Sequence, residues 1–242
     1  PKAHEHKNNV MNKMRDGIAG LMKKYKGDII EGEAKLLPNS LVEINGETHE
    51  ATDILLCTGS SPAIPPIPGV DLDHVVDSTG ILERENLPNY LVVVGGGVIG
   101  CEFACMYASV GVQVTVLEAM SEICPNLDAE VSETLREGLS KKGVAFKLGA
   151  KVESISSDKV SYSDEAGSNE LEADLVLVAT GRRPNTKNLG LEELGLDIDD
   201  RGGVRVDDRG ATNIPGLWAA GDVTGQAWLA HAESRMAEGV VN

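Results

Sequence analysis

The stretch from Leu91 to Glu102 constrains the fold of this 242-residue chain more than any other part of its sequence. A leucine and three valines form a short apolar run that is typical of a strand buried on both faces. The pattern G-x-G-x-x-G follows at once, and residues 103–110 predict a helix. In such a motif one glycine permits the tight turn, one lets the backbone approach a pyrophosphate, and one lets the helix pack closely on the strand. These three roles fall on Gly95, Gly97 and Gly100.

An acidic residue after the next apolar run strengthens this interpretation. Residues 113–117 predict a second strand, and Glu118 follows them. In dinucleotide-binding units an acid about 20 residues beyond the glycines accepts hydrogen bonds from an adenosine ribose. A glycine-rich loop without a ligand is the alternative, because the motif alone is weak evidence. Strand, loop, helix, strand and acid in this order predict a dinucleotide-binding unit.

Composition and charge exclude several classes of function. The hydrophobic content of 41% and the charged content of 25% are those of a globular protein rather than a disordered one. The net charge of −16 argues against nucleic acid or an anionic membrane as the main partner. No apolar stretch approaches the ~20 residues that a bilayer span needs, and no signal-peptide pattern opens the chain. We therefore expect a cytoplasmic protein that binds neither nucleic acid nor membrane.

The four cysteines predict no metal site. None of them stands in the C-x-x-C spacing that is typical of zinc ligands. Cys101 and Cys105 lie four residues apart on the helix after the glycine loop, so they share one of its faces. Free cysteine packs as a small hydrophobe, and we expect packing rather than redox chemistry from this pair. The other two are Cys57 and Cys124.

The segments before the glycine loop predict a helix, a meander and a linker. Residues 5–26 place apolar side chains at helical spacing, which predicts an amphipathic helix. Residues 29–50 predict a short strand at Ile29-Ile30 and an antiparallel meander with a hairpin turn at Asn45-Gly46. A buried strand over 53–57 leads into Thr58-Gly59. Four prolines in 61–69 then predict an extended linker and a domain boundary.

The segments after Glu118 complete one unit and repeat the plan of the preceding one. A helix that stops at Gly143 places Val131, Leu135 and Leu139 on one face, and a third strand follows. A meander then leads into a buried strand over 175–178 and a second Thr-Gly, which indicates an internal duplication. Residues 229–242 predict a helix without a capping signal at its end. We therefore expect the chain to be part of a longer protein.

Taken together, these motifs resemble those of the flavin-dependent pyridine nucleotide–disulfide oxidoreductases. Their order is Thr-Gly at 58–59, the proline-rich linker, G-x-G-x-x-G at 95–100, Ala-Thr-Gly-Arg-Arg-Pro-Asn at 179–185 and Ala-Gly-Asp-Val at 220–223. Within this family, residues 186–195 and 229–231 are most similar to the dihydrolipoyl dehydrogenases. The resemblance covers essentially the whole chain. It implies an α/β fold in which a Rossmann-like, three-layer NAD domain is inserted in a discontinuous FAD-binding domain.

The resemblance also implies domain boundaries and cofactor-binding residues. Residues 1–61 and 185–242 would belong to the FAD-binding domain, 62–87 would be a linker, and 88–181 would form the NAD-binding domain. Asp222 would hydrogen-bond the flavin ribityl chain, and Glu102 would face the nicotinamide end of NAD. The NAD site would comprise Gly95, Gly96, Gly97, Val98, Ile99, Gly100, Glu102, Glu118, Val152 and Gly181. The FAD site would comprise Ala34, Thr58, Gly59, Ser60, Asp222, Trp228, Leu229, Ala230 and His231.

Glu118 favours NAD over NADP as the nucleotide. Relatives that use NADPH place arginines near this position to pair with the 2′-phosphate, whereas a carboxylate repels that group. Here Glu118 is followed by Ala119-Met120, without a basic cluster. The sequence therefore predicts NAD.

By resemblance, the whole enzyme oxidises protein-bound dihydrolipoyl groups and passes electrons through FAD to NAD. Its partner would be a lipoyl-bearing acyltransferase or lipoyl protein of a 2-oxo acid dehydrogenase or glycine cleavage complex, and the whole enzyme would be a homodimer. The family's redox C-x-x-x-x-C, its first glycine-rich loop and its His–Glu base pair are missing from this sequence. We therefore expect no catalytic residue here and no turnover by this chain alone. Another family member, such as an NADH oxidase, mercuric reductase or soluble transhydrogenase, and a non-catalytic NAD-binding module are the alternatives.

Overall fold

The chain folds into two compact units in a computed structural model that describes residues 2–241. Unit 1 contains the N-terminal residues as far as Met11 together with Pro62–Gly181. Unit 2 contains Asn12–Ser61 and the chain from Arg182 onward. The polypeptide therefore leaves unit 2 once and returns to it once, so that most of unit 1 is an insertion in unit 2.

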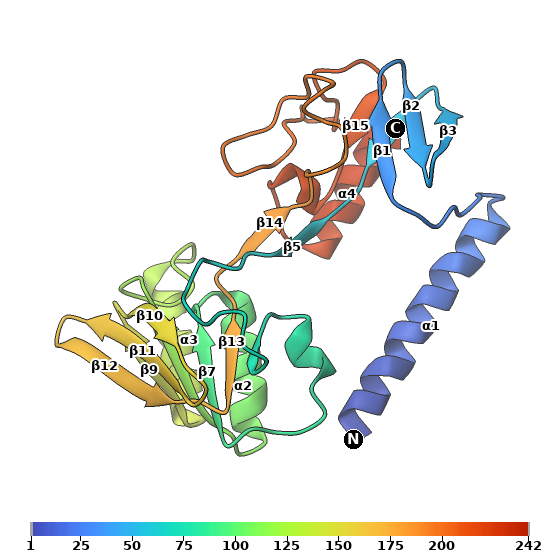
Figure 1. Ribbon diagram of the computed structural model, residues 1–242. Coiled ribbons are helices and arrows are strands. Elements are labelled where there is room, and N and C mark those ends of the chain that lie inside the picture. The colour runs from blue at the N-terminus through green and yellow to red at the C-terminus, as the bar shows by residue number, and fades with distance from the viewer. Residues whose placement is uncertain (1, 242) are drawn as a thin grey trace. The chain divides into compact units, whose positions relative to one another are not determined.

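A five-stranded parallel sheet forms the centre of unit 1 (Figure 1). Its strand order is β6 (Val75–Val76), β13 (Leu175–Val178), β7 (Tyr90–Val94), β8 (Gln113–Glu118) and β9 (Val144–Leu148). The chain runs outward from β7 to β8 and β9 and later adds β13 on the other side of β7. This reversal creates a topological switch point at the carboxyl end of β7, where open α/β sheets bind their ligands.

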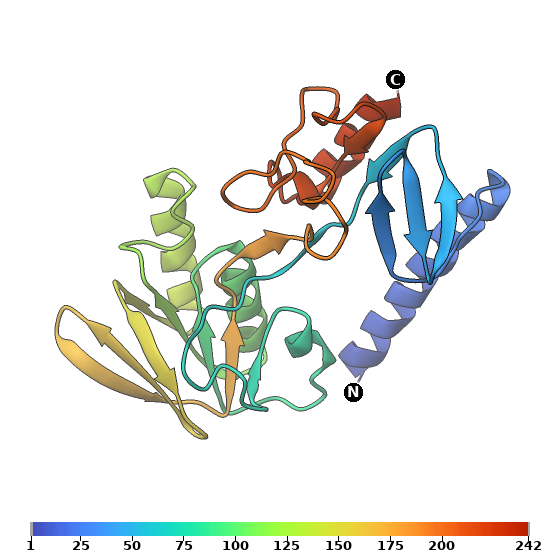
Figure 2. The same ribbon diagram turned by 45° about the horizontal axis from the view of Figure 1, so that its top comes forward.

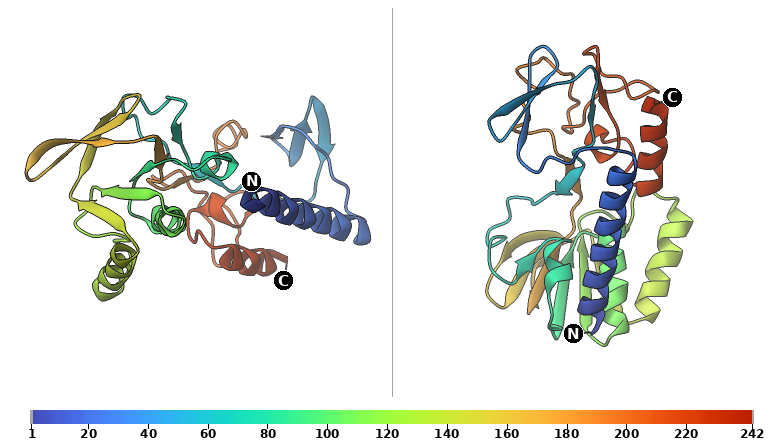
Figure 3. Two further views of the ribbon diagram at one scale, coloured as in Figure 1. Left: turned by 90° about the horizontal axis from the view of Figure 1, so that it is seen from below. Right: turned by 90° about the vertical axis from the view of Figure 1, so that its right-hand side faces the viewer.

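Helices cover one face of this sheet and a second sheet covers the other. Helices α2 (Val98–Ser109) and α3 (Ala129–Lys141) connect the parallel strands β7, β8 and β9. The antiparallel strands β10 (Lys151–Ile155), β11 (Lys159–Asp164) and β12 (Gly167–Glu172) form a three-stranded sheet. In the left view of Figure 3, the β11–β12 hairpin and α3 lie on opposite sides of the parallel sheet. The expected α/β, three-layer arrangement is confirmed.

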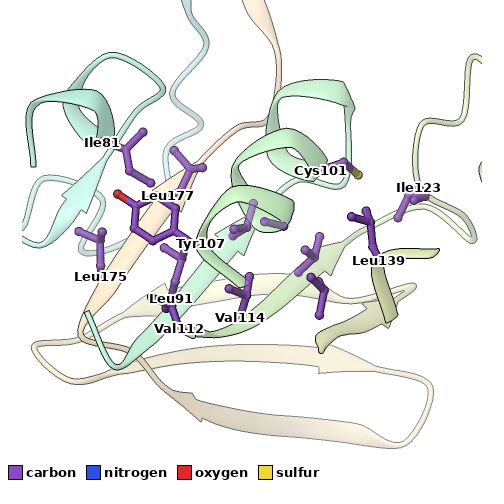
Figure 4. Packing of buried hydrophobic residues seen from close by; sticks show 14 of the residues in the cluster. Ile81, Leu91, Cys101, Tyr107, Val112, Val114, Ile123, Leu139, Leu175 and Leu177 are labelled. Carbon is purple, nitrogen blue, oxygen red and sulfur yellow. The ribbon is translucent and has the colours of Figure 1, made fainter. Parts of the chain in front are cut away.

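The two faces of the parallel sheet bury separate apolar clusters. On the helical face, Tyr107 of α2 packs among side chains of β7 and β13, and Cys101 lies nearer Ile123 and Leu139 (Figure 4). On the other face, Val92 and Val176 pack against Val160 of β11. Burying one such side chain fully contributes roughly 1.5–3 kcal/mol, and the valine run of β7 contributes side chains to both clusters.

The segment 62–87, which the sequence predicts as a linker, is part of the compact unit. It contributes the edge strand β6 and the 3-10 helix η1 (Gly80–Glu83). Ile81 of η1 is buried in the cluster on the helical face. The edge of the unit therefore lies at Pro62 rather than at residue 88.

Unit 2 is built around a parallel pair of strands, β4 (Ile54–Leu56) and β15 (Leu217–Ala219). A three-stranded antiparallel sheet of β1 (Ala34–Leu37), β2 (Leu41–Ile44) and β3 (Glu47–Glu50) precedes β4, as Figure 2 shows in blue. The hairpin at Asn45-Gly46 is confirmed. The order of meander and following strand repeats that of β10–β12 and β13 in unit 1, but of the strand predicted to be buried over 53–57 only Leu56 is buried.

Short elements complete unit 2. Strands β5 (Ser60–Pro62) and β14 (Arg182–Pro184) pair with each other, so residues expected to be loop and linker form a ladder. The 3-10 helix η2 (Asp222–Thr224) follows β15, and α4 (Ala230–Val241) ends the described chain. The core of the unit contains Leu36, Leu56, Leu191, Leu196, Val204, Leu217, Ala219 and Val223.

Three expectations about apolar faces differ from the structure. Helix α1 (Lys2–Lys24) forms as expected, but none of its described residues is buried. No strand forms at Ile29-Ile30, and both side chains are exposed. In α3, Leu139 is buried whereas Val131 and Leu135 are exposed. Helical spacing shows where a face could pack but not whether a partner surface covers it.

None of the helices within residues 2–241 combines the length and the apolar composition that crossing a bilayer requires.

Candidate cofactor-binding sites

Gly95 makes the turn that ends β7. Its φ is +107°, a left-handed conformation that side chains with a Cβ rarely adopt. A Cβ at this position would lie 2.5 Å from the carbonyl oxygen of Ala179, at the end of neighbouring β13. The turn therefore requires glycine both for its backbone conformation and for its contact with the next strand.

Gly97 and Gly100 differ in what surrounds them. A Cβ on Gly97 would meet nothing within 4 Å, and its φ of −71° is accessible to any residue. A Cβ on Gly100 would collide with the carbonyl oxygen of Gly95 and would lie 3.2 Å from Cγ1 of Val93. Gly100 therefore maintains close helix–strand packing. Gly97 leaves open space at the first turn of α2, where unpaired N–H groups and the helix dipole attract an anion.

Glu118 is bonded directly to the glycine loop. It ends β8, with only 8% of its surface exposed. Its Oε2 accepts a hydrogen bond of 2.6 Å from the backbone N–H of Gly96, and Oε1 accepts one of 2.7 Å from the N–H of Met120. A carboxylate has about four lone-pair sites, so two backbone donors leave acceptor capacity for a ribose. The sequence predicts the acid but not its bond to Gly96, because the two residues are far apart in the chain.

The other residues predicted for the NAD site lie at different depths. Val98 and Glu102 are exposed at the start of α2, and Ile99 is half-buried. Gly181 is exposed just beyond β13, with a φ of +124°. Val152 of β10 packs partly into the core beneath the sheet.

The segment after Glu118 is held to α3 by an ion pair. Nε of Arg136 donates to Oε1 and Oε2 of Glu122 over 2.8 and 3.1 Å, and the N–H of Ile123 also donates to Oε1. The hydrogen bond from Arg136 is the main cause that lowers the pKa of Glu122 from its ordinary 4.5. The ion pair therefore stabilises the fold while Glu122 is ionised.

This ion pair predicts a pH-dependent term in the stability of the chain. A carboxyl with a lowered pKa stabilises the fold above its unfolded pKa, and the contribution is lost as pH falls through the folded pKa. We expect Glu122→Gln to lower the free energy of unfolding by about 0.5 kcal/mol at pH 7, because the pair is partly exposed to solvent. Urea unfolding at pH 7 and at pH 3 measures this term. An equal difference between the wild type and the variant at both values would contradict it.

In unit 2, two residues predicted for the FAD site, Ser60 of β5 and Asp222, are linked by hydrogen bonds that also involve Arg182 of β14. Nε of Arg182 donates to Oγ of Ser60 over 2.7 Å, and Nη2 donates to the carbonyl oxygen of Ser60 over 2.8 Å. Oγ of Ser60 in turn donates to Oδ2 of Asp222. The Arg182 guanidinium also lies 3.8 Å from Oδ2 of Asp222. This chain of contacts fixes the orientation of the Asp222 carboxylate.

The second carboxylate oxygen of Asp222 is available to a ligand. Oδ1 is buried, and it accepts no hydrogen bond from residues 2–241 in the structure. Glu233 interacts with Asp222 from α4 and can donate only when it is protonated, so this interaction, together with burial, raises the pKa of Glu233. A buried acceptor without a donor costs free energy, and a ligand hydroxyl would satisfy it. Asp222 therefore fits the ribityl chain of a flavin.

The Thr58-Gly59 turn is closed by Asn185. Oγ1 of Thr58 donates to the carbonyl oxygen of Asn185 over 2.7 Å, and Nδ2 of Asn185 donates back to the carbonyl oxygen of Thr58 over 2.9 Å. The N–H of Asn185 donates to the carbonyl oxygen of Gly59. Arg182 and Asn185 stand in the segment 179–185 that marks the family, but their partners near residue 60 could not be read from the sequence.

The remaining residues predicted for the FAD site are not joined to this network by hydrogen bonds within residues 2–241. Ala34 begins β1 opposite Ile44 and is exposed. Trp228, Leu229, Ala230 and His231 are exposed at and before the start of α4.

Comparison with known proteins identifies the family. Residues 1–239 match the model of the pyridine nucleotide-disulphide oxidoreductases. A dihydrolipoyl dehydrogenase of Chlamydia pneumoniae is 38% identical over 245 residues, which cover 100% of this chain and 52% of that protein. Dihydrolipoyl dehydrogenase 3 of Pseudomonas putida is 42% identical over 228 residues, 89% of this chain and 48% of that protein.

Solved structures show the same relationship. The HOCl-induced flavoprotein disulfide reductase RclA of Escherichia coli superposes with a TM-score of 0.90 at 34% identity, over 98% of this chain and 55% of that one. LpdA of Mycobacterium tuberculosis gives a TM-score of 0.89 at 28% identity, over 99% and 55%. The chain thus spans about half the length of the relatives that it matches. This chain belongs to the pyridine nucleotide-disulphide oxidoreductase family.

Proposed function

We propose that unit 1 binds NAD and that unit 2 contributes to the FAD site of a dihydrolipoyl dehydrogenase. The observation that carries the proposal is the bond between Glu118 and Gly96, because it places an acid beside the phosphate-binding loop. A carboxylate there accepts ribose hydroxyls and repels the 2′-phosphate of NADP. Residues 119–124 add no basic side chain that could offset this repulsion. NAD is therefore the expected nucleotide.

The residues of unit 2 would hold the flavin rather than react with it. Bound FAD supplies the two-electron chemistry that links a dithiol to a nicotinamide. Oδ1 of Asp222 would accept a ribityl hydroxyl, and the Thr58-Gly59 turn would offer backbone groups to the cofactor. This sequence has no C-x-x-x-x-C, so we expect it alone not to oxidise dihydrolipoamide.

The remaining parts of the proposal concern the whole protein. A dihydrolipoyl dehydrogenase would act on the lipoyl group of an acyltransferase or lipoyl protein in a 2-oxo acid dehydrogenase or glycine cleavage complex. It would be a homodimer in the cytoplasm, with neither nucleic acid nor membrane as a partner. Its cofactors would be FAD and NAD.

Nucleotide titration tests the proposal on this chain. We expect NADH to bind at least about tenfold more tightly than NADPH, because placing like charges together is strongly unfavourable. Glu118→Gln keeps an acceptor oxygen but removes the charge, so the preference for NADH should shrink in this variant. Fluorescence of the bound dihydronicotinamide gives both affinities. Equal affinities in the wild type, or no NADH binding at millimolar concentration, would contradict the proposal.

A flavoprotein disulfide reductase with another substrate is the second candidate. The structural likeness to RclA favours it, because that protein is such a reductase and covers the same part of the fold. Turnover of dihydrolipoamide by the whole protein distinguishes the two. Activity comparable to that of a dihydrolipoyl dehydrogenase supports that function. Absence of this activity in a protein that retains FAD supports a disulfide reductase with another substrate.

A further inference from the structure

Two buried cysteines, Cys101 and Cys124, meet beneath the dinucleotide loop although they lie far apart in the sequence. Cys101 lies in the first turns of α2 and Cys124 in the irregular segment between β8 and α3. Only 3% and 4% of their respective surfaces are exposed. In Figure 4 the side chain of Cys101 projects from α2 toward the segment that carries Ile123.

Both thiols share one acceptor. Sγ of Cys101 lies 3.4 Å from the carbonyl oxygen of Gly96, and Sγ of Cys124 lies 3.6 Å from the same oxygen. The backbone N–H of Cys124 also donates to it over 2.9 Å. The two side chains interact with each other as well, and this interaction adds to the effect of burial in raising the pKa of Cys101 to about 12. The sulfur atoms are therefore near neighbours.

The shared acceptor belongs to the glycine that anchors Glu118. Gly96 uses its N–H to bind the Glu118 carboxylate and its carbonyl oxygen to receive the thiols and Cys124. Cys124 itself has a φ of +45°, a left-handed conformation that costs free energy in a residue with a Cβ. Any displacement of the two sulfur atoms therefore acts on the loop that approaches the pyrophosphate.

We propose that Cys101 and Cys124 form an oxidisable pair, which a small neutral hydroperoxide converts into a disulfide that weakens dinucleotide binding to unit 1. One S–S bond forms while two S–H bonds and the O–O bond of the peroxide break. The sulfur atoms lose two electrons, the peroxide oxygens gain them, and with hydrogen peroxide the products are the disulfide and two water molecules. The effect on binding rests on the proposed NAD site, whereas formation of the disulfide does not.

The disulfide would alter the loop in two ways. It removes both S–H donors from the carbonyl oxygen of Gly96, and it draws the sulfur atoms to ~2.05 Å from each other. Losing hydrogen bonds and shifting the loop should weaken NADH binding by about tenfold. A change of this size in affinity corresponds to the free energy of about one hydrogen bond. Reduction with a dithiol should restore it.

Burial determines the rate of the reaction. The thiolate is the reactive form, and burial raises the pKa values of Cys101 and Cys124, so both are protonated at neutral pH. Oxidation should be slow at pH 7 and should accelerate by up to about tenfold per pH unit while the thiols remain protonated. The exposed thiol of Cys57 and the half-buried thiol of Cys105 lie outside this pair and provide matched controls.

The experiment uses the chain with Cys57→Ser and Cys105→Ser, which leaves only the pair. After treatment with hydrogen peroxide, peptide mass spectrometry should find Cys101 linked to Cys124, and NADH titration should show the weaker affinity. A variant that also carries Cys124→Ser keeps a hydroxyl donor toward Gly96, and peroxide should not change its affinity for NADH.

Two results would overturn the proposal. Failure of the link to form even at alkaline pH, where the reaction should be faster, while peroxide oxidises Cys57 in the unaltered chain, would refute the pair. A complete link with unchanged NADH affinity would refute its effect on binding. Absence of NADH binding by the fully reduced chain would instead refute the proposed function, and the mass measurement would still decide whether the pair exists.

Discussion

Replacing Gly97 with alanine is expected to remove most NADH binding while leaving the fold intact. The backbone of Gly97 is extended, and a Cβ there would meet nothing within 4 Å. Where alanine can adopt the backbone conformation of a glycine without strain, replacing that glycine with alanine stabilises a protein by about 0.4–1 kcal/mol. The same open space is where a pyrophosphate must approach the N–H groups of α2. The methyl group should therefore obstruct the bound nucleotide without disturbing the fold.

The size of this effect follows from the contacts that the methyl group displaces. A hydrogen bond to a charged group contributes about 1.5–3 kcal/mol, so losing one should weaken NADH binding by about 10- to 150-fold. NADH titration and thermal unfolding of the same preparation measure affinity and stability together. Gly138→Ala is the matched control, because a Cβ at Gly138 in α3 also meets nothing within 4 Å but lies outside the predicted site. Unchanged affinity in Gly97→Ala would show that the phosphate binds elsewhere.

Replacing Gly100 with alanine should instead destabilise unit 1. Its Cβ would collide with the carbonyl oxygen of Gly95 and press on Val93 in the core of the sheet. The carbonyl is backbone and cannot rotate away, so α2 must move from β7. Overpacking of this kind costs about 1–3 kcal/mol.

Urea unfolding measures the loss for Gly100→Ala. The midpoint should fall while the slope with denaturant stays the same, because the surface exposed on unfolding does not change. Gly138→Ala again provides the control, and it should be neutral or stabilising because alanine favours a helix interior. A Gly100→Ala variant as stable as the wild type would contradict the close packing of α2 on β7.

The opposite expectations for Gly97 and Gly100 show what the sequence could predict. The strand, glycine loop and helix form through local interactions, so the motif alone predicts the turn at Gly95 and the packing at Gly100. The three-layer fold follows from the order of apolar runs, because parallel strands joined by helices must be covered on both faces.

Features that depend on contacts between distant segments could not be predicted in the same way. Strand β6 has only two residues, so it leaves no periodic signal, and the burial of Ile81 in η1 depends on the sheet beside it. The bond from Gly96 to Glu118 and the contact between Ser60 and Asp222 join residues far apart in the chain. Only the folded structure brings them together.

The exposed face of α1 has a different explanation. Its apolar spacing predicts a packed helix, yet Met14 and Ile18 are more than 60% exposed. Spacing reports that a face could be buried, whereas burial needs a complementary surface.

We propose that unit 1 presents an NAD site at the carboxyl end of β7. Backbone amide spectra of the isotopically labelled chain, recorded during titration with NADH, test it most directly. We expect saturable shifts at Gly96, Gly97 and Val98, together with Met120, whose N–H is bonded to Glu118. Saturable shifts confined to other parts of the chain, or no shifts at millimolar NADH, would contradict it.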